Sequence, residues 1–251
     1  VEGETEALVV DTKFPPGSGD LRHWVSGHVK VPVTRVVNTH YHYDHTLGND
    51  LYPGATVLAH VEVPSLLRER EPDQVREHPS GVPAVLVNDP LRLEVGGREL
   101  LLFHPGAGAA HTRGDLVVYL PREKVLAVGD LLFNGYYPFF DLGHGGADVP
   151  GLIRAARELA AKYPDATVVP GHGPIARAPD LLRYADYLEA LWTQVQACRS
   201  RGCTEDQAAA SIDLSRWGLS LLPSFHGRKL EWATAERNVR NAFHLAGALT
   251  P

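Results

Sequence analysis

The chain has 251 residues, 44% of them hydrophobic, and a formal net charge of −6. This length and apolar content predict one large α/β domain with a substantial core. The acidic balance and the lack of a dense Lys/Arg run argue against a nucleic-acid partner, and no apolar run nears the roughly 18 residues of a membrane span. We therefore expect a small-molecule substrate and no membrane partner. No signal peptide is recognised at the start, which favours a soluble, cytoplasmic protein, or a periplasmic or secreted one if an N-terminal signal has been removed.

Strand-like and helix-like patterns follow one another through the first two thirds of the chain. Gly96-Gly97 joins two alternating runs and is a hairpin signal. The expected strands are 7–10, 33–38, 56–59, 91–95, 100–103, 116–120 and 124–128, and the expected helices are 21–29, 64–68 and 151–162. Strands followed by helices, in two similar halves, fit two sheets capped by helices on both faces.

The pattern changes beyond residue 176. Residues 180–198 have the apolar spacing of an amphipathic helix, and 204–211 and 230–247 also read as helical. We therefore expect a catalytic core over 1–176 and a C-terminal helical extension over 177–251 that packs on the same domain. These helices could also cover a site or form a homodimer contact. Cys198 and Cys203, the two cysteines of the chain, are expected to be ordinary thiols, with a local disulfide as the alternative.

The most informative stretch is His40-Tyr41-His42-Tyr43-Asp44-His45, which follows a predicted strand. On an extended chain His40 and His42 point to the same side and can bind one ion. If the chain then turns into a helix, Asp44 and His45 point elsewhere, toward a second ion. Imidazole and carboxylate groups without thiolate suit zinc, and also iron or manganese.

Three later residues could complete such a site: His111, Asp130 and His172. Each follows or closes a strand-like segment, and each has glycine nearby. A strand end next to glycine can present a side chain into a shared cleft and leave room for a ligand.

Together these motifs, in this order, resemble the metallo-β-lactamase-fold hydrolase superfamily over roughly residues 5–175. The resemblance implies an α/β fold, a four-layer αββα sandwich of two mixed β-sheets flanked by helices, here with the C-terminal helical extension. It also implies that His40, His42 and His111 hold one metal, that Asp44, His45 and His172 hold a second, and that Asp130 bridges the two.

Two adjacent divalent ions imply a hydrolase that uses a metal-bridging hydroxide, most simply with two Zn²⁺. We expect cleavage of an ester, lactone or thioester bond, with Asp44 or Asp130 helping to move the proton. True β-lactamases of this fold generally lack the bridging aspartate, so Asp130 disfavours that activity. An iron-dependent sulfur (persulfide) dioxygenase and a non-catalytic metal-binding accessory protein remain alternatives.

Two loops are candidates for the substrate pocket. The first directly follows the strand of Asp130 and carries four aromatic residues beside the expected metal edge, which could form an apolar wall or face the core. The second loop lies near the C-terminus and contains Phe225 and His226. His144, which lies between two glycines, could also reach the substrate. The candidate residues are Tyr136, Tyr137, Phe139, Phe140, His144, Phe225 and His226.

Overall fold

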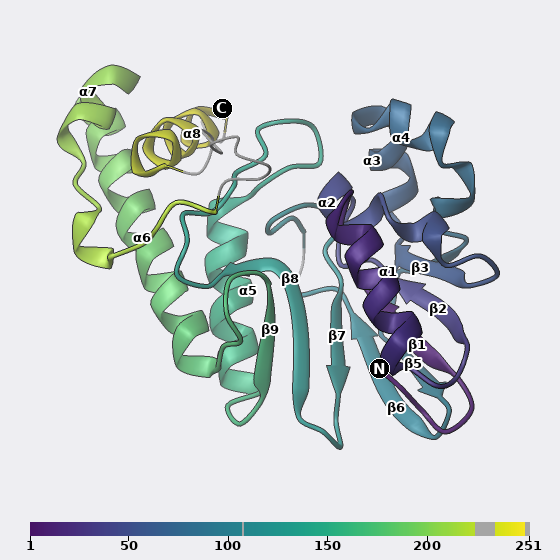
Figure 1. Ribbon diagram of the computed structural model, residues 1–251. Coiled ribbons are helices and arrows are strands. Elements are labelled where there is room, and N and C mark those ends of the chain that lie inside the picture. The colour runs from purple at the N-terminus through teal and green to yellow at the C-terminus, as the bar shows by residue number, and fades with distance from the viewer. Residues whose placement is uncertain (107, 224–233, 249–251) are drawn as a thin grey trace. The chain divides into compact units, whose positions relative to one another are not determined.

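The computed structural model describes residues 1–106, 108–223 and 234–248. The chain divides into two compact units, Val1–Pro105 with Gly114–Gly129, and Gly106–Arg113 with Asp130–Pro251. Each unit contains buried apolar residues of its own. Strand β8 (Val125–Phe133) runs from the first unit into the second at Gly129 and Asp130 (Figure 1).

The first unit contains a four-stranded sheet in the order β1-β2-β3-β4. Its strands are β1 (Ala7–Val10), β2 (Val33–Val37), β3 (Thr56–His60) and β4 (Val85–Val87), and all three pairings are parallel. Parallel strands buried on both faces tend to be apolar, and the buried parts of β2 and β3 are: Val36 and Val37 in β2, and Val57, Leu58 and Ala59 in β3. The helical segments are α1 (Gly17–His28), α2 (Tyr43–Thr46), η1 (Asn49–Leu51), α3 (Val63–Arg70), α4 (Pro72–Glu77) and η2 (Pro79–Gly81).

Helices α1 and α3 bury their apolar residues in separate clusters of the first unit. Val25 of α1 packs with Val36 and Val57 of the sheet. Leu66 of α3 packs with Tyr41, which lies inside the His-rich motif. The motif is therefore fixed by a packed aromatic side chain as well as by the preceding strand.

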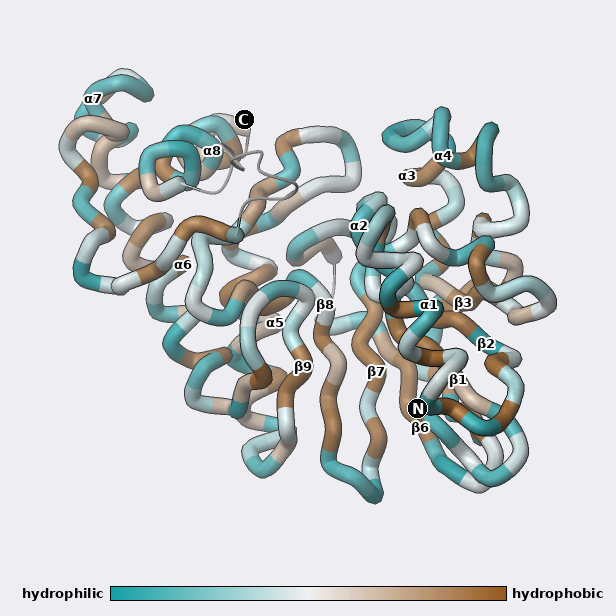
Figure 2. Tube along the Cα trace, viewed as in Figure 1, coloured by the Kyte–Doolittle hydropathy of each residue, from teal (hydrophilic) through white to brown (hydrophobic). Residues whose placement is uncertain are grey.

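The second sheet has the order β5-β6-β7-β8-β9. Besides β8, it contains β5 (Leu91–Val95), β6 (Arg98–Phe103), β7 (Val117–Leu120) and β9 (Thr167–His172). The pairings from β5 to β8 are antiparallel, and Gly96 and Gly97 make the predicted hairpin turn with φ of 52° and 84°. The tube in Figure 2 is strongly hydrophobic along β7 and β8. The pairings of the first sheet are therefore parallel, and those from β5 to β8 in the second sheet are antiparallel.

The second unit is largely helical: α5 (Val149–Lys162), α6 (Ala178–Ser200), α7 (Glu205–Ser211), η3 (Ser215–Trp217) and α8 (Ala235–Ala248). Helices α5 and α6 pack side by side (Figure 1). The Asp148 side chain caps α5 by accepting a hydrogen bond from the Gly151 amide. The Tyr187 hydroxyl of α6 donates to Asn238 Oδ1 of α8 at 2.7 Å, which ties these helices together inside the unit.

Most predicted elements are present, with ends that shift by a few residues. The sequence reading missed α4 and β4, which are short and carry little buried surface. Residues 230–233 of the predicted last helix lie outside the described residues, and the division at 176 and 177 stays a prediction. Within the described ranges, no helix combines the length and the hydropathy needed to cross a membrane.

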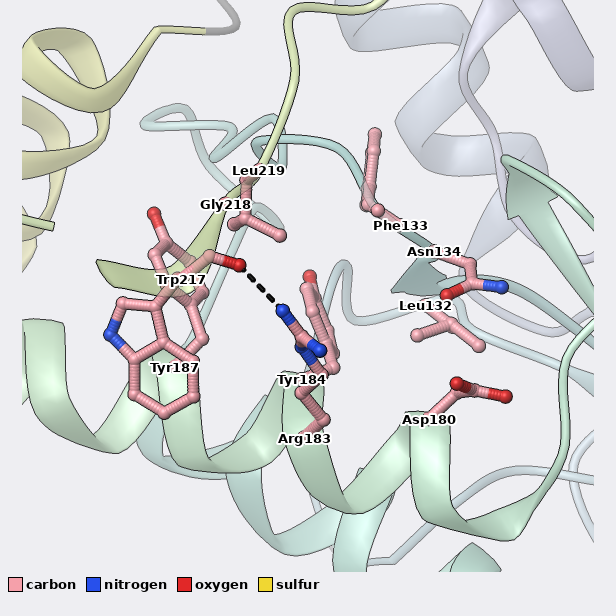
Figure 3. Close-up of a pocket in the computed structure, with 11 residues that line it drawn as sticks. Leu132, Phe133, Asn134, Asp180, Arg183, Tyr184, Tyr187, Trp217, Gly218 and Leu219 are labelled. Carbon is pink, nitrogen blue, oxygen red and sulfur yellow. Dashed lines mark hydrogen bonds between the residues drawn. The ribbon is translucent and has the colours of Figure 1, made fainter. Parts of the chain in front are cut away.

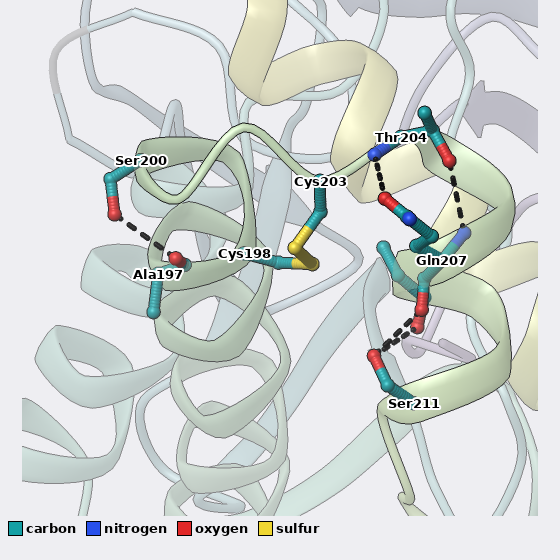
Figure 4. The surroundings of a disulfide bond; sticks show 8 residues. Ala197, Cys198, Ser200, Cys203, Thr204, Gln207 and Ser211 are labelled. Atoms are coloured by element: carbon teal, nitrogen blue, oxygen red, sulfur yellow. Dashed lines mark hydrogen bonds between the residues drawn. A yellow bond between two sulfur atoms is a disulfide. The ribbon is translucent and has the colours of Figure 1, made fainter.

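The expectation of two ordinary thiols is wrong in this structure. Cys198, near the end of α6, forms a disulfide with Cys203, and their Cα atoms are 5.3 Å apart (Figure 4). Gly202 has a φ of 78° and turns the chain back toward the helix. This left-handed conformation suits glycine, and it brings Cys203 within bonding distance.

Candidate metal site

The His-rich motif begins directly after β2 and places two imidazoles together. His40 Nε2 lies 2.9 Å from His42 Nδ1. The other ring nitrogen of His40, Nδ1, lies 3.1 Å from the Thr39 hydroxyl. Both rings are buried. The two rings therefore lie on the same side of the chain, as the i, i+2 spacing predicted, with these two nitrogens at a hydrogen-bond distance.

The short helix α2 turns the rest of the motif in a different direction. His45 Nε2 lies 3.6 Å from Asp44 Oδ2, and His45 Nδ1 lies 2.7 Å from Asp11 Oδ2. A histidine that donates its Nδ1–H to a carboxylate presents its Nε2 lone pair to a metal. Burial and then the Asp44 charge raise the pKa of the adjacent Tyr43, which keeps that phenol neutral.

Asp11 contacts the His-rich motif and was not singled out from the sequence. Its Oδ1 accepts a hydrogen bond from the Thr39 amide at 2.8 Å, and its Oδ2 accepts one from the Thr39 hydroxyl at 2.7 Å. Together with the bond to His45, this carboxylate fixes both ends of the motif. Its φ of 57° is in the left-handed region that Asp tolerates better than most residues. In the sequence, the only indication of this role of Asp11 is that an acidic residue directly follows a predicted strand.

A buried polar network supports the same loop. Asn38 Nδ2 donates to the His45 carbonyl and to Asn49 Oδ1, both at 3.0 Å. Asn49 Nδ2 donates to Asn38 Oδ1 at 2.8 Å, and the Thr12 hydroxyl donates to Asn49 Oδ1 at 2.7 Å. Because buried polar groups are costly unless paired, this network fixes the loop conformation.

Glycine is required at position 129 because the backbone there lies very close to the Thr39 side chain, within the first unit. A Cβ atom built there would lie 2.4 Å from Thr39 Oγ1 and 2.6 Å from Thr39 Cβ. The residue also has a φ of 54°. Only glycine fits this backbone next to the threonine that contacts both Asp11 and His40.

The second unit supplies the other three predicted ligands. His111 Nε2 lies 3.4 Å from Asp130 Oδ2, and His172 Nε2 lies 3.3 Å from the same oxygen. Charge-assisted hydrogen bonds are shorter, roughly 2.7–2.9 Å. By contrast, two donor atoms each about 2.0–2.1 Å from a tetrahedral ion are about 3.3–3.4 Å apart. The spacing of these atoms therefore fits a shared metal better than a shared proton.

The positions of these three residues differ in part from the sequence expectation. His172 ends β9 as expected, but Asp130 lies inside β8, which continues to Phe133, and His111 lies in a loop. The buried Phe133 ring stacks on His172 with centroids 4.8 Å apart and lies 6.0 Å from His111. Phe133 thus orients two imidazoles and was missed, because a phenylalanine in an apolar strand has no distinctive sequence signal.

Among the described residues, the His and Asp side chains grouped so that they could hold a metal ion are the predicted ones. They are His40, His42, Asp44 and His45 in the first unit and His111, Asp130 and His172 in the second. Imidazole nitrogens and carboxylate oxygens of this kind fit a divalent metal.

The candidate pocket residues are placed in several environments. Tyr136 and Tyr137 pair with Ser220 through backbone contacts. Phe140 is 1% exposed and belongs to the core, one of the two environments expected for this loop. His144 is exposed, and its Nε2 lies 3.3 Å from Arg113 Nη1. Phe139 is partly buried, and Phe225 and His226 lie outside the described residues.

A family model for the metallo-beta-lactamase superfamily matches residues 1–172. The chain therefore belongs to this superfamily, and its two sheets with flanking helices and C-terminal helices have the expected fold.

Individual relatives are more distant. The chain is 34% identical over 141 residues to the 2,4-dinitroanisole O-demethylase subunit alpha of Nocardioides sp., a match that covers 54% of this chain and 40% of that protein. It is 32% identical over 161 residues to a hydroxyacylglutathione hydrolase of Polaromonas sp., covering 59% of this chain and 54% of that protein. A solved metallo-beta-lactamase from Pontibacter korlensis aligns with a TM-score of 0.60 and 27% identity, covering 75% of this chain and 85% of that chain. The chain thus spans about half the length of these two curated relatives.

Proposed function

We propose that this protein is a binuclear zinc-dependent hydrolase that cleaves an ester, lactone or thioester bond of a small molecule. The observation that carries the proposal is the approach of His111 Nε2 and His172 Nε2 to one oxygen of Asp130, at the separation of ligands on a tetrahedral ion. In this proposal His40, His42 and His111 hold the first zinc, Asp44, His45 and His172 hold the second, and Asp130 bridges them.

Bound zinc would lower the pKa of water to about 7 and would polarise the substrate carbonyl. The residues of the chain position these ligands. Asp11 holds His45 in the tautomer that leaves Nε2 for the metal, and Phe133 fixes the plane of His172.

The two acidic ligands have different surroundings. The Asp44 side chain is 23% exposed, whereas the Asp130 side chain is 3% exposed. A carboxylate that reaches solvent can exchange a proton with water, and a buried bridging carboxylate cannot do so easily. We therefore assign the proton transfer to an Asp44 oxygen and the bridging role to Asp130.

The bond class is supported by one relative. The hydroxyacylglutathione hydrolase is, by its name, a hydrolase of an acylated thiol. The other two relatives are a demethylase subunit and a β-lactamase by name. The substrate therefore has to be established by a panel of bond types rather than by analogy.

The test is hydrolysis by the zinc-loaded protein across aryl esters, lactones, acyl thioesters, phosphodiesters and a chromogenic β-lactam, with Asp130→Ala as the blank. We expect turnover of an acyl bond, two zinc ions per chain by elemental analysis, and loss of both the second zinc and most activity in the variant. Two tightly bound zinc ions in Asp130→Ala would overturn the bridging role. Bound iron together with oxygen consumption would identify a dioxygenase instead. Full metal loading without turnover of any substrate in the panel would identify an accessory protein.

A further inference from the structure

The residue that directly follows β8 contacts three consecutive residues of the loop that carries His172. Strand β8 ends at Phe133, and the next residue is Asn134. His172 ends β9, and Gly173 and Pro174 follow it. Figure 3 shows Asn134 next to Phe133 on the wall of a pocket inside the second unit. The contacts between Asn134 and this loop lie within the second unit.

The first contact joins the two backbones. The Asn134 N–H donates to the His172 carbonyl at 2.9 Å. This bond lies one residue beyond the end of β8, next to the last residue of β9. It fixes the peptide group of the candidate ligand, but any residue except proline could make it. This contact alone therefore does not require asparagine.

The second contact uses the asparagine side chain. Asn134 Nδ2 donates to the Pro174 carbonyl at 2.9 Å. Pro174 lies two residues after His172, so Asn134 binds the loop on both sides of Gly173. A side-chain amide offers N–H donors that alanine, leucine and aspartate lack. Two hydrogen bonds on either side of one residue prevent the loop from turning about either of them alone.

The third contact is a close approach at Gly173. A Cβ atom built there would lie 2.2 Å from the Asn134 carbonyl oxygen and 3.1 Å from the Asn134 Cβ. Gly173 also has a φ of 104°, in the region that favours glycine. The loop therefore packs backbone against backbone on Asn134.

The backbone of Asn134 is itself fixed from the far side. The Gly135 carbonyl accepts a hydrogen bond from the Ser220 amide at 2.9 Å. The Pro138 carbonyl accepts one at 2.7 Å from Nδ2 of Asn238, a fully buried residue of α8. A side chain can hold a loop in place only if its own backbone does not move. Asn134 meets this condition, because β8 precedes it and an anchored segment follows it.

Phe133 and Asn134 act on different parts of His172. The Phe133 ring stacks on the imidazole, with centroids 4.8 Å apart, and so fixes the ring. Asn134 fixes the backbone from which the ring projects. The His172 side chain is 22% exposed, whereas that of His111 is 0% exposed. A partly exposed ligand has fewer packing contacts, so its position depends more on the hydrogen bonds of its backbone.

We propose that Asn134 is a positioning residue for His172, which it serves by holding the loop of Gly173 and Pro174 through its side-chain amide. The inference rests on the proposed hydrolase function, which makes His172 a zinc ligand. Asn134 does not bind the metal itself. It orders the ligand in advance, so that less of the binding free energy is lost in ordering the loop.

The experiment is stepwise competition for zinc between the full chain and a chromophoric chelator. His172→Ala identifies the zinc ion that His172 binds. Asn134→Ala should weaken the binding of that same ion about three- to tenfold, the worth of one net hydrogen bond, and should leave any other zinc ion within about twofold. Asn134→Leu keeps the approximate shape of asparagine without its N–H donors and should weaken the same ion equally.

A matched control and thermal unfolding separate positioning from general stability. Asn88→Ala removes an exposed asparagine of the first unit and should leave zinc affinity unchanged. The metal-free Asn134→Ala protein should unfold close to the wild-type temperature, because the hydrogen bond that it loses lies at the surface. A structural role would instead lower this temperature and weaken every bound zinc ion alike.

Each outcome decides between the proposals. Wild-type zinc affinity in Asn134→Ala, at the ion that His172→Ala identifies, would overturn the positioning role. Wild-type affinity in Asn134→Leu alone would also overturn it, because shape and not the N–H donor would then hold the loop. One bound zinc ion that both His172→Ala and Asn134→Ala weaken would support Asn134 and overturn only the binuclear proposal. If His172→Ala weakens no zinc ion, His172 is not a ligand and both proposals fail.

Discussion

Replacement of Asp11 by Asn tests whether Asp11 sets the orientation and tautomer of His45, a candidate metal ligand. Asn tolerates the left-handed backbone at this position, so the substitution should leave the fold intact. In the native protein Asp11 accepts three hydrogen bonds, from the Thr39 amide, the Thr39 hydroxyl and His45 Nδ1. An amide has one acceptor oxygen and one donor nitrogen, so it cannot reproduce all three.

The amide oxygen must face the Thr39 N–H, which can only donate. The amide nitrogen then faces His45 Nδ1, which has to become an acceptor. The His45 proton moves to Nε2, and this ring nitrogen loses the lone pair that would bind the metal. The lost charge-assisted hydrogen bond is worth about 1.5–3 kcal/mol. That energy corresponds to roughly 10- to 100-fold weaker zinc binding, the range typical of such substitutions.

The assay is competition for zinc against a chromophoric chelator, with thermal unfolding of the metal-free protein measured in parallel. Asp50→Asn is the matched control, because Asp50 Oδ2 makes the same kind of contact with His78 Nδ1 at 2.6 Å and neither residue is a candidate ligand. A zinc affinity of Asp11→Asn within twofold of wild type and of the control would refute the assigned role of Asp11.

Three further predictions concern stability. Gly129→Ala should lower the free energy of unfolding by about 2–4 kcal/mol, because its Cβ would overlap Thr39 and its φ is positive; an unchanged denaturant midpoint would contradict this. Burial and a neighbouring imidazole lower the pKa of His60 from 6.5 to about 4, so the native protein binds fewer protons than the unfolded chain between these values. Stability should therefore fall as pH drops from 6.5 to 4, and His60→Gln should flatten that part of the curve in urea titrations at several pH values. The disulfide between Cys198 and Cys203 closes a loop with a sequence separation of 5, so replacing both cysteines by Ser should destabilise the protein by about 2 kcal/mol; identical urea curves for variant and wild type would show that the cross-link does not contribute.

The fold was predictable where local pattern and final environment agree. The alternating runs around Gly96-Gly97 and the valine- and leucine-containing segments of β2 and β3 appear as the expected strands. Helices α5 and α6 follow their apolar spacing. By contrast, α4 and β4 gave no such pattern, because they are too short and too exposed for periodicity to show.

The candidate site divides in the same way. His40 and His42 are neighbours in sequence, so their convergence follows from the backbone geometry of a strand end. Asp11 and Phe133 could not be recognised, because each acts only through its contact with a histidine. The interpretation of the two cysteines failed for a related reason, since the turn at Gly202 decides whether the sulfurs meet.

The sequence by itself determined the superfamily, the strand and helix content and the chemical type of the candidate ligands, because these depend on residue identity and short-range spacing. Only the tertiary structure decided which carboxylate orients His45, which aromatic ring supports His172, and which tyrosine of α6 bonds to α8. Tyr184 and Tyr187 are three positions apart on one helix, and the sequence does not show which hydroxyl is satisfied. Asn238 satisfies one of them, from a helix more than 50 residues away, because packing places it there.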